Sequence, residues 1–423
     1  MTIRMLSLFA VLGFTAAAQA ADWPCANGTY RSSDGVYVTL ANPSAASGKT
    51  TQRFTFLDGR VGFLGEDDAP VCMDGTLQQT TPKAQIFERV PLKLTPTHFD
   101  SNGTDLAGLL IEPETADANT PLVVLVHGSE NTGSINNIHY PYTFAGQGIA
   151  AFVFDKRGTG TSKGTYTQNF ATLAADVVAA GNEAKRLTKG RYHRFGLYGG
   201  SQGGWVAPLA AQTLHPDFVA VGFGLVLSPL EEDAEQVFDE LRRAGCGEDV
   251  IKAAHEVTDA TGAIIASHFT AGFDTLAAVK ARYGKEAWFT AIKGEFTGEI
   301  LAATEADLRA HGPERLDNLD IIWRYDAVTE LKKLTMPQLW VMAAEDTAAP
   351  GALSRDRLAA LRKDGVPIEV VVFPHTDHGI YEFTTLPDGT RKTTRLAEGY
   401  LRLLTEWMKG ISNPPYGDSA VMP

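Results

Sequence analysis

The sequence predicts an α/β protein built on a mostly parallel sheet. Short, continuously apolar runs, such as residues 122–126 and 151–154, are typical of strands that are buried on both faces. Longer stretches with helical spacing, notably residues 170–187 and 203–214, separate the later runs. Strands and helices that alternate in this way form a parallel sheet covered by helices, and ligands bind beyond the carboxyl ends of its strands.

The N-terminus has the pattern of a secretory signal peptide over residues 1–20. A short basic opening that ends at Arg4 precedes an apolar run, and Ala18-Gln19-Ala20 matches a small-x-small cleavage site. The apolar run is shorter than a membrane span, and no other stretch approaches about 20 uncharged apolar residues. We therefore expect cleavage near Ala20 and a periplasmic or secreted mature protein without a membrane span.

Length and charge set further limits. The chain has 423 residues and a formal net charge of -13, which argues against nucleic acid and anionic membrane surfaces as partners. This length exceeds what one hydrophobic core holds, so we expect a large α/β domain and a smaller unit. Short strand signals predict that residues 21–88 form a small β-rich module, with the polar residues 78–83 as a linker. An accessory role for this module is favoured over ligand or partner binding.

The three cysteines suit an oxidising compartment. Cys25 and Cys72 both lie in the N-terminal module, and we predict a disulfide between them. In the chain-entropy model, closing this loop stabilises the fold by roughly 4 kcal/mol. Cys246 lies far away in a helical region and is expected to be a free thiol.

The main α/β domain is expected in two parts, residues 89–228 and 335–423. The intervening residues 229–334 are helical in character and carry many aromatics, which predicts a lid over the site. Most of those aromatics are expected to pack the core of the lid itself. A closing helix is expected at residues 391–409. The predicted strands are residues 89–99, 106–111, 122–126, 151–154, 195–198, 219–227, 338–342 and 368–373.

The stretch Gly199-Gly200-Ser201-Gln202-Gly203 places a serine in the G-x-S-x-G pattern between a strand and a helix. A strand that turns directly into a helix strains the intervening residue, and glycines on either side remove β-carbons that would clash. The serine hydroxyl is then held out over the edge of the sheet. Ser201 is therefore the candidate nucleophile, and its chemistry requires a base, an acid and an oxyanion hole.

An acid and a base follow two later strands. The strand at 338–342 leads into Asp346, and the strand at 368–373 leads into His378. Serine, acid and histidine therefore come in the chain order used by enzymes whose nucleophile lies in this kind of turn.

From about residue 90 to the C-terminus, the chain resembles the α/β-hydrolase superfamily and, within it, the serine aminopeptidase and carboxylesterase-like branch. The resemblance implies a sheet of about eight strands with a helical lid inserted after the sixth, where residues 229–334 lie. It does not cover the first ninety residues. Four features carry it: His127-Gly128-Ser129 after a strand, the run DKRGTGTS at residues 155–162, the Ser201 turn, and the loops of Asp346 and His378.

The resemblance implies a role for each site residue. His378 would accept the proton of Ser201, and Asp346 would hold the imidazole in the correct tautomer. The resemblance also places the oxyanion hole at two backbone N–H groups, that of Gln202 and one in the loop that follows His127-Gly128, for which we choose Ser129. The neighbouring alternatives are His375 as the base and Glu345 as the acid, while Asp377 is expected to be a solvated loop residue.

Two parts of the pattern leave questions open. Relatives often carry a glycine after the serine of the oxyanion loop, where this chain has Glu130, so the exact second donor stays open. His127 is expected to support the loop instead of reacting. The run at 155–162 lacks the spacing of a phosphate-binding loop, and the resemblance implies a structural turn. No cofactor is expected.

Together these features predict a serine hydrolase that cleaves carboxylic esters through an acyl-enzyme, with a small-molecule ester or acyl compound as substrate. A serine peptidase, an aminopeptidase or a thioesterase is the alternative, because lids of this composition serve these activities too. A binding protein on an inactive scaffold is the alternative from another class. A metallohydrolase is disfavoured, because the zinc pattern that ends at His378 would need a histidine where Phe373 stands.

Overall fold

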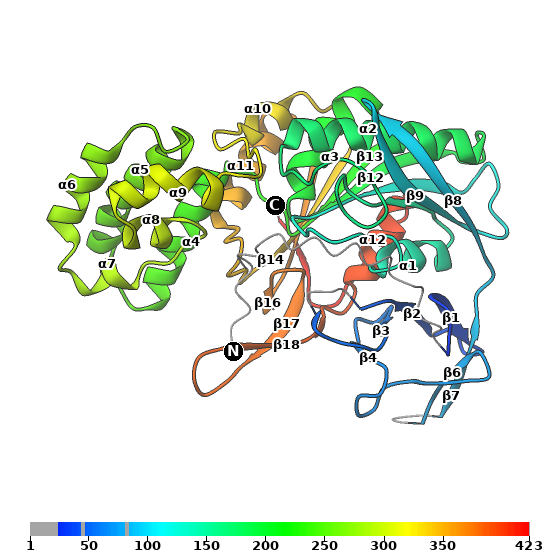
Figure 1. Cartoon of the computed structure of the whole chain (residues 1–423). Coiled ribbons are helices and arrows are strands. Elements are labelled where there is room, and N and C mark those ends of the chain that lie inside the picture. Colours follow the sequence, from blue (N-terminus) through cyan, green and yellow to red (C-terminus); the bar gives the residue numbers. More distant parts are fainter. Residues whose placement is uncertain (1–23, 44–46, 81–83, 423) are drawn as a thin grey trace.

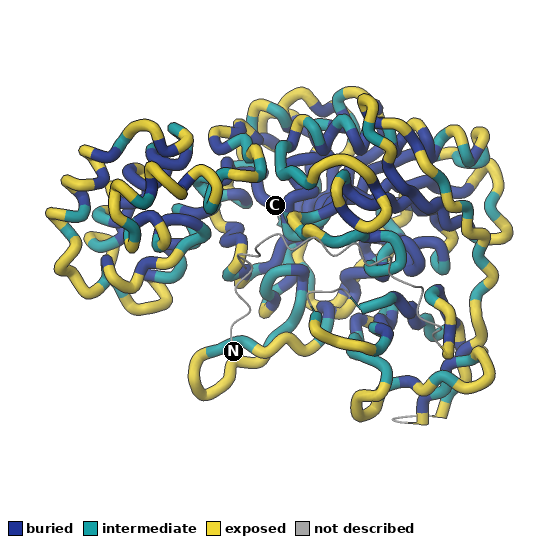
Figure 2. The backbone as a smooth tube through the Cα atoms, in the orientation of Figure 1, coloured by how far each residue is buried: buried dark blue, intermediate teal, exposed yellow. Residues whose placement is uncertain are grey.

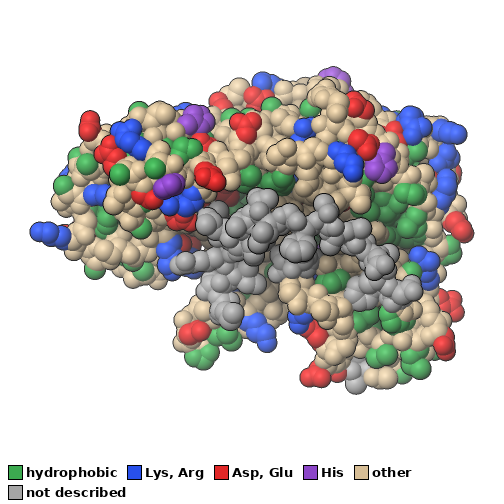
Figure 3. All heavy atoms as spheres, in the orientation of Figure 1, with side chains coloured by type: hydrophobic (Ala, Val, Ile, Leu, Met, Phe, Trp, Pro, Cys, Tyr) green, Lys and Arg blue, Asp and Glu red, His purple; other side chains and the backbone are tan. Residues whose placement is uncertain are grey.

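The computed structural model describes residues 24–43, 47–80 and 84–422 of the chain, so the expected signal peptide lies outside the described residues. Figure 1 shows a central α/β layer with a β-rich module below it and a helical lobe to one side. Within the described ranges, no helix is both long and apolar enough to cross a membrane. On the face shown in Figure 3, lysine and arginine side chains are interspersed with acidic ones and do not gather into one patch.

The central sheet has nine strands among the described residues, in the order β19-β15-β14-β13-β12-β10-β11-β9-β8. Strands β10 to β15 pair in parallel, whereas β8, β9 and β19 pair antiparallel with their neighbours. Strands β8 to β15 match the expected sheet of about eight, and β19 adds a short edge. The bounds are β8 (Leu92–Ser101), β9 (Thr104–Pro113), β10 (Pro121–Val126), β11 (Ala150–Phe154), β12 (Arg194–Gly200), β13 (Phe218–Gly222), β14 (Gln338–Ala343), β15 (Ile368–Phe373) and β19 (Ala420–Val421).

Helices cover both faces of this sheet, as the continuously apolar strands predict. Leu122 and Val124 of β10 face the cluster that holds the side chains of α2, α3 and α11. Val123 and Leu125 point the other way, toward α1 and α12, because successive side chains of a strand alternate between its faces. The bounds are α1 (Tyr140–Gly146), α2 (Phe170–Thr188), α3 (Gly203–Leu214), α11 (Ala352–Lys363) and α12 (Tyr400–Met408).

Two expected elements near the sheet are wrong in extent. The strand expected at 219–227 ends at Gly222, so residues 223–227 lead away from the sheet toward the lobe. The closing helix expected at 391–409 begins only at Tyr400. Its first part is instead β18, in a small antiparallel sheet that contains β16 (Thr376–Asp377), β17 (Tyr381–Thr385) and β18 (Arg391–Leu396).

In the described part of the N-terminal module, seven strands form an antiparallel sheet in the order β4-β3-β2-β1-β7-β6-β5. The predicted disulfide between Cys25 and Cys72 is confirmed, and Cys246 is free. The linker expected at 78–83 is wrong where it is described, because Gln78 and Gln79 belong to β6 and pair with β7. The bounds are β1 (Gly28–Ser32), β2 (Tyr37–Ala41), β3 (Arg53–Phe56), β4 (Val61–Phe63), β5 (Val71–Met73), β6 (Thr76–Gln79) and β7 (Gln85–Arg89).

The module packs tightly on the α/β layer. The backbone N–H of Leu396 donates to the carbonyl of Gly59 at 2.9 Å, so the β3–β4 turn lies against the end of β18. A β-carbon on Gly59 would lie 2.2 Å from the Leu396 carbonyl oxygen, which only a glycine avoids. Leu57 and Val61 pack against the same apolar cluster as α12. The module is therefore joined to the elements that follow β15.

The helical lobe lies between β13 and β14. Its aromatics mostly fill its own interior, as expected: Phe238 and Phe289 lie in one buried cluster, and Phe269, Phe273 and Phe296 lie in another. Figure 2 shows these buried segments enclosed by exposed ones. The helices are α4 (Pro229–Arg243), α5 (Glu248–Ala266), α6 (Phe273–Tyr283), α7 (Ala287–Ala291), α8 (Thr297–Ala302), α9 (Glu305–Leu316) and α10 (Ala327–Lys332), the last of which packs on the α/β layer.

Candidate active site

Ser201 lies in a sharp turn between β12 and α3. Its φ of 53° is left-handed, a conformation that an L-residue adopts only under strain. Space around the turn requires the flanking glycines. A β-carbon on Gly199 would lie 2.5 Å from the carbonyl oxygen of Gly203, and one on Gly203 would lie 2.8 Å from that of Val126. The turn therefore holds the serine at the carboxyl end of the sheet, as the motif predicts.

The structure brings Ser201, His378 and Asp346 together. Atom Nε2 of His378 lies 3.2 Å from Ser201 Oγ, and Nδ1 of the same ring lies 2.9 Å from Asp346 Oδ2. Strands β14 and β15 are neighbours in the sheet, so the loops that follow them carry Asp346 and His378 to the same edge. The other oxygen of Asp346 accepts hydrogen bonds from the backbone N–H groups of Ala348 and Ala349. These bonds fix the carboxylate, whose side chain is only 4% exposed.

Electrostatics favour the protonated form of His378. Burial acts to lower the pKa of His378, but the carboxylates of Asp346, Glu232 and Asp377 outweigh burial, and the pKa is raised from 6.5. Glu232 belongs to α4 in the helical lobe. Burial, together with the charge of Glu295, raises the pKa of Glu232 to about 8. The lobe thus brings acidic groups close enough to act on the imidazole.

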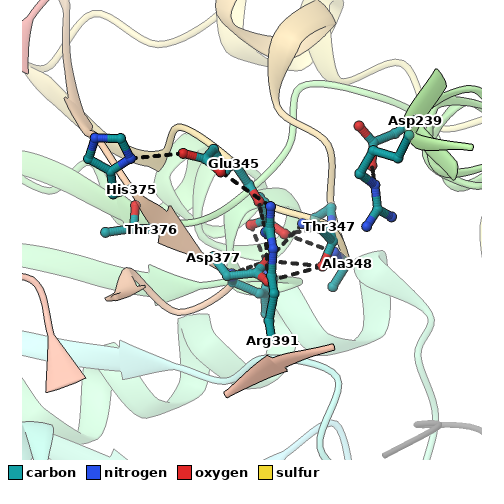
Figure 4. A network of polar contacts seen from close by, with 12 residues as sticks. Asp239, Glu345, Thr347, Ala348, His375, Thr376, Asp377 and Arg391 are labelled. Atoms are coloured by element: carbon teal, nitrogen blue, oxygen red, sulfur yellow. Dashed lines mark hydrogen bonds and ion pairs between the residues drawn. The ribbon is translucent and has the colours of Figure 1, made fainter. Parts of the chain in front are cut away.

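The alternative base and acid lie elsewhere. The side chain of His375 is 90% exposed, and its Nδ1 lies 3.2 Å from Glu345 Oε1. Glu345 also pairs with Arg391, as Figure 4 shows. Neither His375 nor Glu345 contacts Ser201, so both belong to a polar network beside the site.

Asp377 differs from expectation, because it is not a solvated loop residue. Its carboxylate accepts hydrogen bonds from the backbone N–H groups of Thr347 and His378, at 2.8 Å and 2.9 Å. Arg391 adds an ion pair at 2.9 Å (Figure 4). Burial acts to raise the pKa of Asp377, but these donors offset it and the pKa is lowered. Asp377 therefore ties the loop of Asp346 to the loop of His378.

Two backbone N–H groups beside Ser201 are available to an anion. Within the described part of the chain, neither Gln202 nor Ser129 has an acceptor for its backbone N–H. Gln202 is the N-cap of α3, where the helix dipole favours negative charge. A β-carbon on Gly128 would lie 3.5 Å from Ser201 Cβ, so the peptide that joins Gly128 to Ser129 lies beside the serine.

The loop that carries Ser129 is held by the end of β11 and by the residue that follows it. His127 is hydrogen-bonded through Nε2 to the carbonyl of Phe154, and burial lowers the pKa of His127 to about 3, so the ring is neutral. Asp155 accepts hydrogen bonds from the backbone N–H groups of Ser134 and Ile135. These contacts agree with the supporting role expected of His127 and with a structural turn at 155–162.

Two supporting residues could not be identified from the sequence. Lys156 is buried and donates from Nζ to the carbonyl of Gly128 at 2.8 Å, next to Ser129. Arg53, from the N-terminal module, donates to the hydroxyl of Tyr381. A β-carbon on Gly379 would lie 2.8 Å from the Tyr381 ring, so this tyrosine packs against the residue that follows His378.

A model of the alpha/beta hydrolase family matches residues 123–389, which is more than half of the chain. "Uncharacterized protein YfhR" of Escherichia coli (strain K12) is 30% identical over 126 residues, which cover 29% of this chain and 43% of that protein. "Quorum-quenching protein AidA" of Acinetobacter baumannii (strain MDR-ZJ06) is 32% identical over 120 residues, covering 28% and 39%. The chain spans less than half of the length of these curated relatives.

Similar solved structures include the Pyrococcus furiosus esterase Pf2001, with a TM-score of 0.42, 12% identity and coverage of 68% of this chain and 85% of that chain. They also include a Pyrococcus horikoshii acylaminoacyl peptidase, with a TM-score of 0.45, 14% identity and coverage of 92% and 57%. The family match, over the segment that contains the Ser201 turn and the loops of Asp346 and His378, shows that the chain belongs to the alpha/beta hydrolase family.

Proposed function

We propose that this protein is a serine hydrolase that cleaves carboxylic esters, with Ser201 as nucleophile, His378 as general base and Asp346 as its orienting acid. One observation carries the proposal: a single imidazole lies 3.2 Å from the serine hydroxyl and 2.9 Å from a buried carboxylate. This is the arrangement that a weakly nucleophilic hydroxyl needs to attack a carbonyl at neutral pH.

The reaction has two halves. In the first, Ser201 Oγ bonds to the carbonyl carbon of the ester while its proton passes to His378 Nε2. The bond from that carbon to the leaving oxygen then breaks, and His378 returns the proton to the departing alcohol. In the second half, water attacks the acyl carbon and loses a proton to His378. The bond from that carbon to Ser201 Oγ then breaks, and His378 returns the proton to Oγ as the acid product leaves. The carboxylate of Asp346 stabilises the imidazolium that forms in each half.

The tetrahedral intermediates require donors for the negative oxygen. The backbone N–H groups of Gln202 and Ser129 are the proposed pair, supported by their position beside Ser201 and by their lack of another acceptor in the described ranges. A lost donor of this kind typically costs about 3 to 4 kcal/mol of transition-state stabilisation.

Export to the periplasm or the medium is part of the proposal. The leader-like residues 1–20 support it, and so does the disulfide between Cys25 and Cys72, because disulfides persist in oxidising compartments.

An aminopeptidase is the second candidate, and the acidic groups of the helical lobe favour it. Glu232 and Glu295 both act electrostatically on His378. A free amino group on a substrate would meet two carboxyl groups there, and a bound cation would return both toward their ionised form. The helical lobe would then act as the predicted lid and as a selector for the amino end of the substrate.

A substrate screen separates these activities. Purified protein is assayed with p-nitrophenyl esters of graded acyl length and with aminoacyl p-nitroanilides, alongside Ser201→Ala. We expect ester cleavage to dominate and to fall by several orders of magnitude in the variant. Faster turnover of the anilides would establish the aminopeptidase instead. Ester cleavage that survives in Ser201→Ala at the original rate would refute both serine mechanisms.

A further inference from the structure

Lys156 carries a buried positive charge to which the proposed reaction assigns no role. Its residue exposure is 1%, and it follows Asp155 at the end of β11. Burying an ammonium group is costly unless hydrogen bonds compensate for the lost water. The hydrogen bond from Nζ of Lys156 goes to the carbonyl oxygen of Gly128, at 2.8 Å. The buried ammonium group of Lys156 is therefore hydrogen-bonded to the peptide group between Gly128 and Ser129.

That peptide group ends in the proposed oxyanion donor. The carbonyl of Gly128 and the N–H of Ser129 belong to the same planar, resonance-coupled unit. A cation on the oxygen draws electron density toward it and leaves the N–H more positive, as hydrogen bonds in a chain polarise one another. The next carbonyl, that of Ser129, is held by the hydroxyl of Tyr166 at 2.7 Å. Both sides of the Ser129 N–H are therefore fixed.

We propose that Lys156 is a positioning residue for the oxyanion hole, which orients and polarises the peptide between Gly128 and Ser129 toward the negative oxygen of the tetrahedral intermediate. The inference rests on the proposed serine mechanism and on Ser129 as one of its donors.

The surroundings of Lys156 support a fixed electrostatic role. Nζ of Lys156 lies over the ring of Tyr166, 5.1 Å from the ring centroid, so an aromatic face covers part of the ammonium group. Burial lowers the pKa of Lys156, and the charge of Glu130 opposes that effect. Glu130, at the position where relatives often have glycine, therefore supplies a negative charge that favours the protonated form of Lys156. In a site with little water, a fixed charge acts more strongly on a forming oxyanion than the same charge would in solvent.

The test uses two variants and a matched control. Lys156→Met removes the charge and the donor at similar length, and Lys156→Gln keeps a neutral donor. Lys163→Met removes the same charge from an exposed position in the same segment. Each protein is assayed with p-nitrophenyl acetate and with an aryl trifluoromethyl ketone, which forms a tetrahedral adduct with a serine. Rates are expressed per site that a fluorophosphonate labels at completion, so that misfolded protein does not count.

For Lys156→Met we expect kcat to fall by about tenfold to a hundredfold, below the roughly 10²- to 10³-fold loss typical of deleting a whole donor. We expect KM to stay near the wild-type value, and the affinity for the ketone to fall by the same factor as kcat/KM. Lys156→Gln is expected to lie between Lys156→Met and wild type, and Lys163→Met to match wild type.

The proposal is overturned if Lys156→Met keeps the wild-type kcat per labelled site, or if kcat falls without a parallel loss of ketone affinity. It is also overturned if neither Lys156 variant can be labelled, because the residue would then be needed for folding. These outcomes differ from failure of the proposed function, in which the wild-type protein does not cleave the ester or Ser201→Ala cleaves it equally well.

Discussion

Replacing Asp346 by asparagine tests how the acid works, because the structure dictates which way the new side chain must turn. In the native site Oδ1 accepts hydrogen bonds from the backbone N–H groups of Ala348 and Ala349, and Oδ2 faces His378 Nδ1 at 2.9 Å. Only an oxygen satisfies the two backbone donors, so the amide nitrogen of the asparagine must face the histidine. That nitrogen donates a proton and cannot accept one.

The consequence is the wrong tautomer of His378. With a donor opposite Nδ1, the ring keeps its proton on Nε2, the atom that must accept the proton of Ser201. The same substitution in another serine hydrolase lowers kcat by about 10⁴-fold with the geometry intact, which corresponds to about 5 kcal/mol of transition-state stabilisation. We expect a loss of this size for Asp346→Asn, with KM changed little.

The assay measures ester turnover at saturating substrate, with Glu345→Gln as the matched control. Glu345 is the neighbouring acid that contacts His375 and Arg391 instead of His378, so its loss should leave kcat within a few fold of wild type. A thermal melt checks that Asp346→Asn is folded. Turnover within tenfold of wild type in Asp346→Asn would refute the assigned role and the side-chain orientation on which it depends.

Because the pKa of His378 is raised from 6.5 and the base must be neutral, kcat/KM should rise with pH through a midpoint above 6.5; a midpoint at or below that value would contradict the electrostatics. Arg53→Met removes the donor to Tyr381 and should cost about 1 to 3 kcal/mol in urea unfolding, whereas Arg31→Met, at an exposed position, should cost less than about 0.5 kcal/mol; equal losses would count against the contact. Cys25→Ser opens the disulfide and should lower the free energy of unfolding by roughly 4 kcal/mol, and a reductant should then have no further effect; an unchanged stability would show that the bridge does not restrain the unfolded chain.

Local patterns explain what the sequence could predict. The glycines around Ser201 constrain their own turn, so the motif and the structure agree residue by residue. Asp346 and His378 each follow a buried strand, and a parallel sheet necessarily brings such positions to one edge. Cys25 and Cys72 both lie in one small module, far from Cys246 in the sequence, so their pairing could also be predicted.

What the sequence could not predict depends on contacts between distant segments. The sequence of residues 391–396 does not distinguish a strand from the first turns of a helix. These residues form a strand because they pair with β17. Asp377 looked like a solvated neighbour of His378, because its partners Thr347 and Arg391 become visible only once the loops meet. The sequence indicated only that Lys156 is part of a turn. Its contact with the carbonyl of Gly128 could not be predicted, because that residue lies 28 positions earlier in the chain.

The proposed mechanism requires one covalent bond, from Ser201 to the acyl group of the substrate. The direct measurement is to quench the enzyme in acid during turnover of a slow p-nitrophenyl ester and to map the modified peptide by mass spectrometry. We expect one acyl group per protein, on the serine of the Gly199 to Gly203 turn, and none in Ser201→Ala. An acyl group on another residue, or full ester turnover with no modified serine at any quench time, would contradict the proposed mechanism.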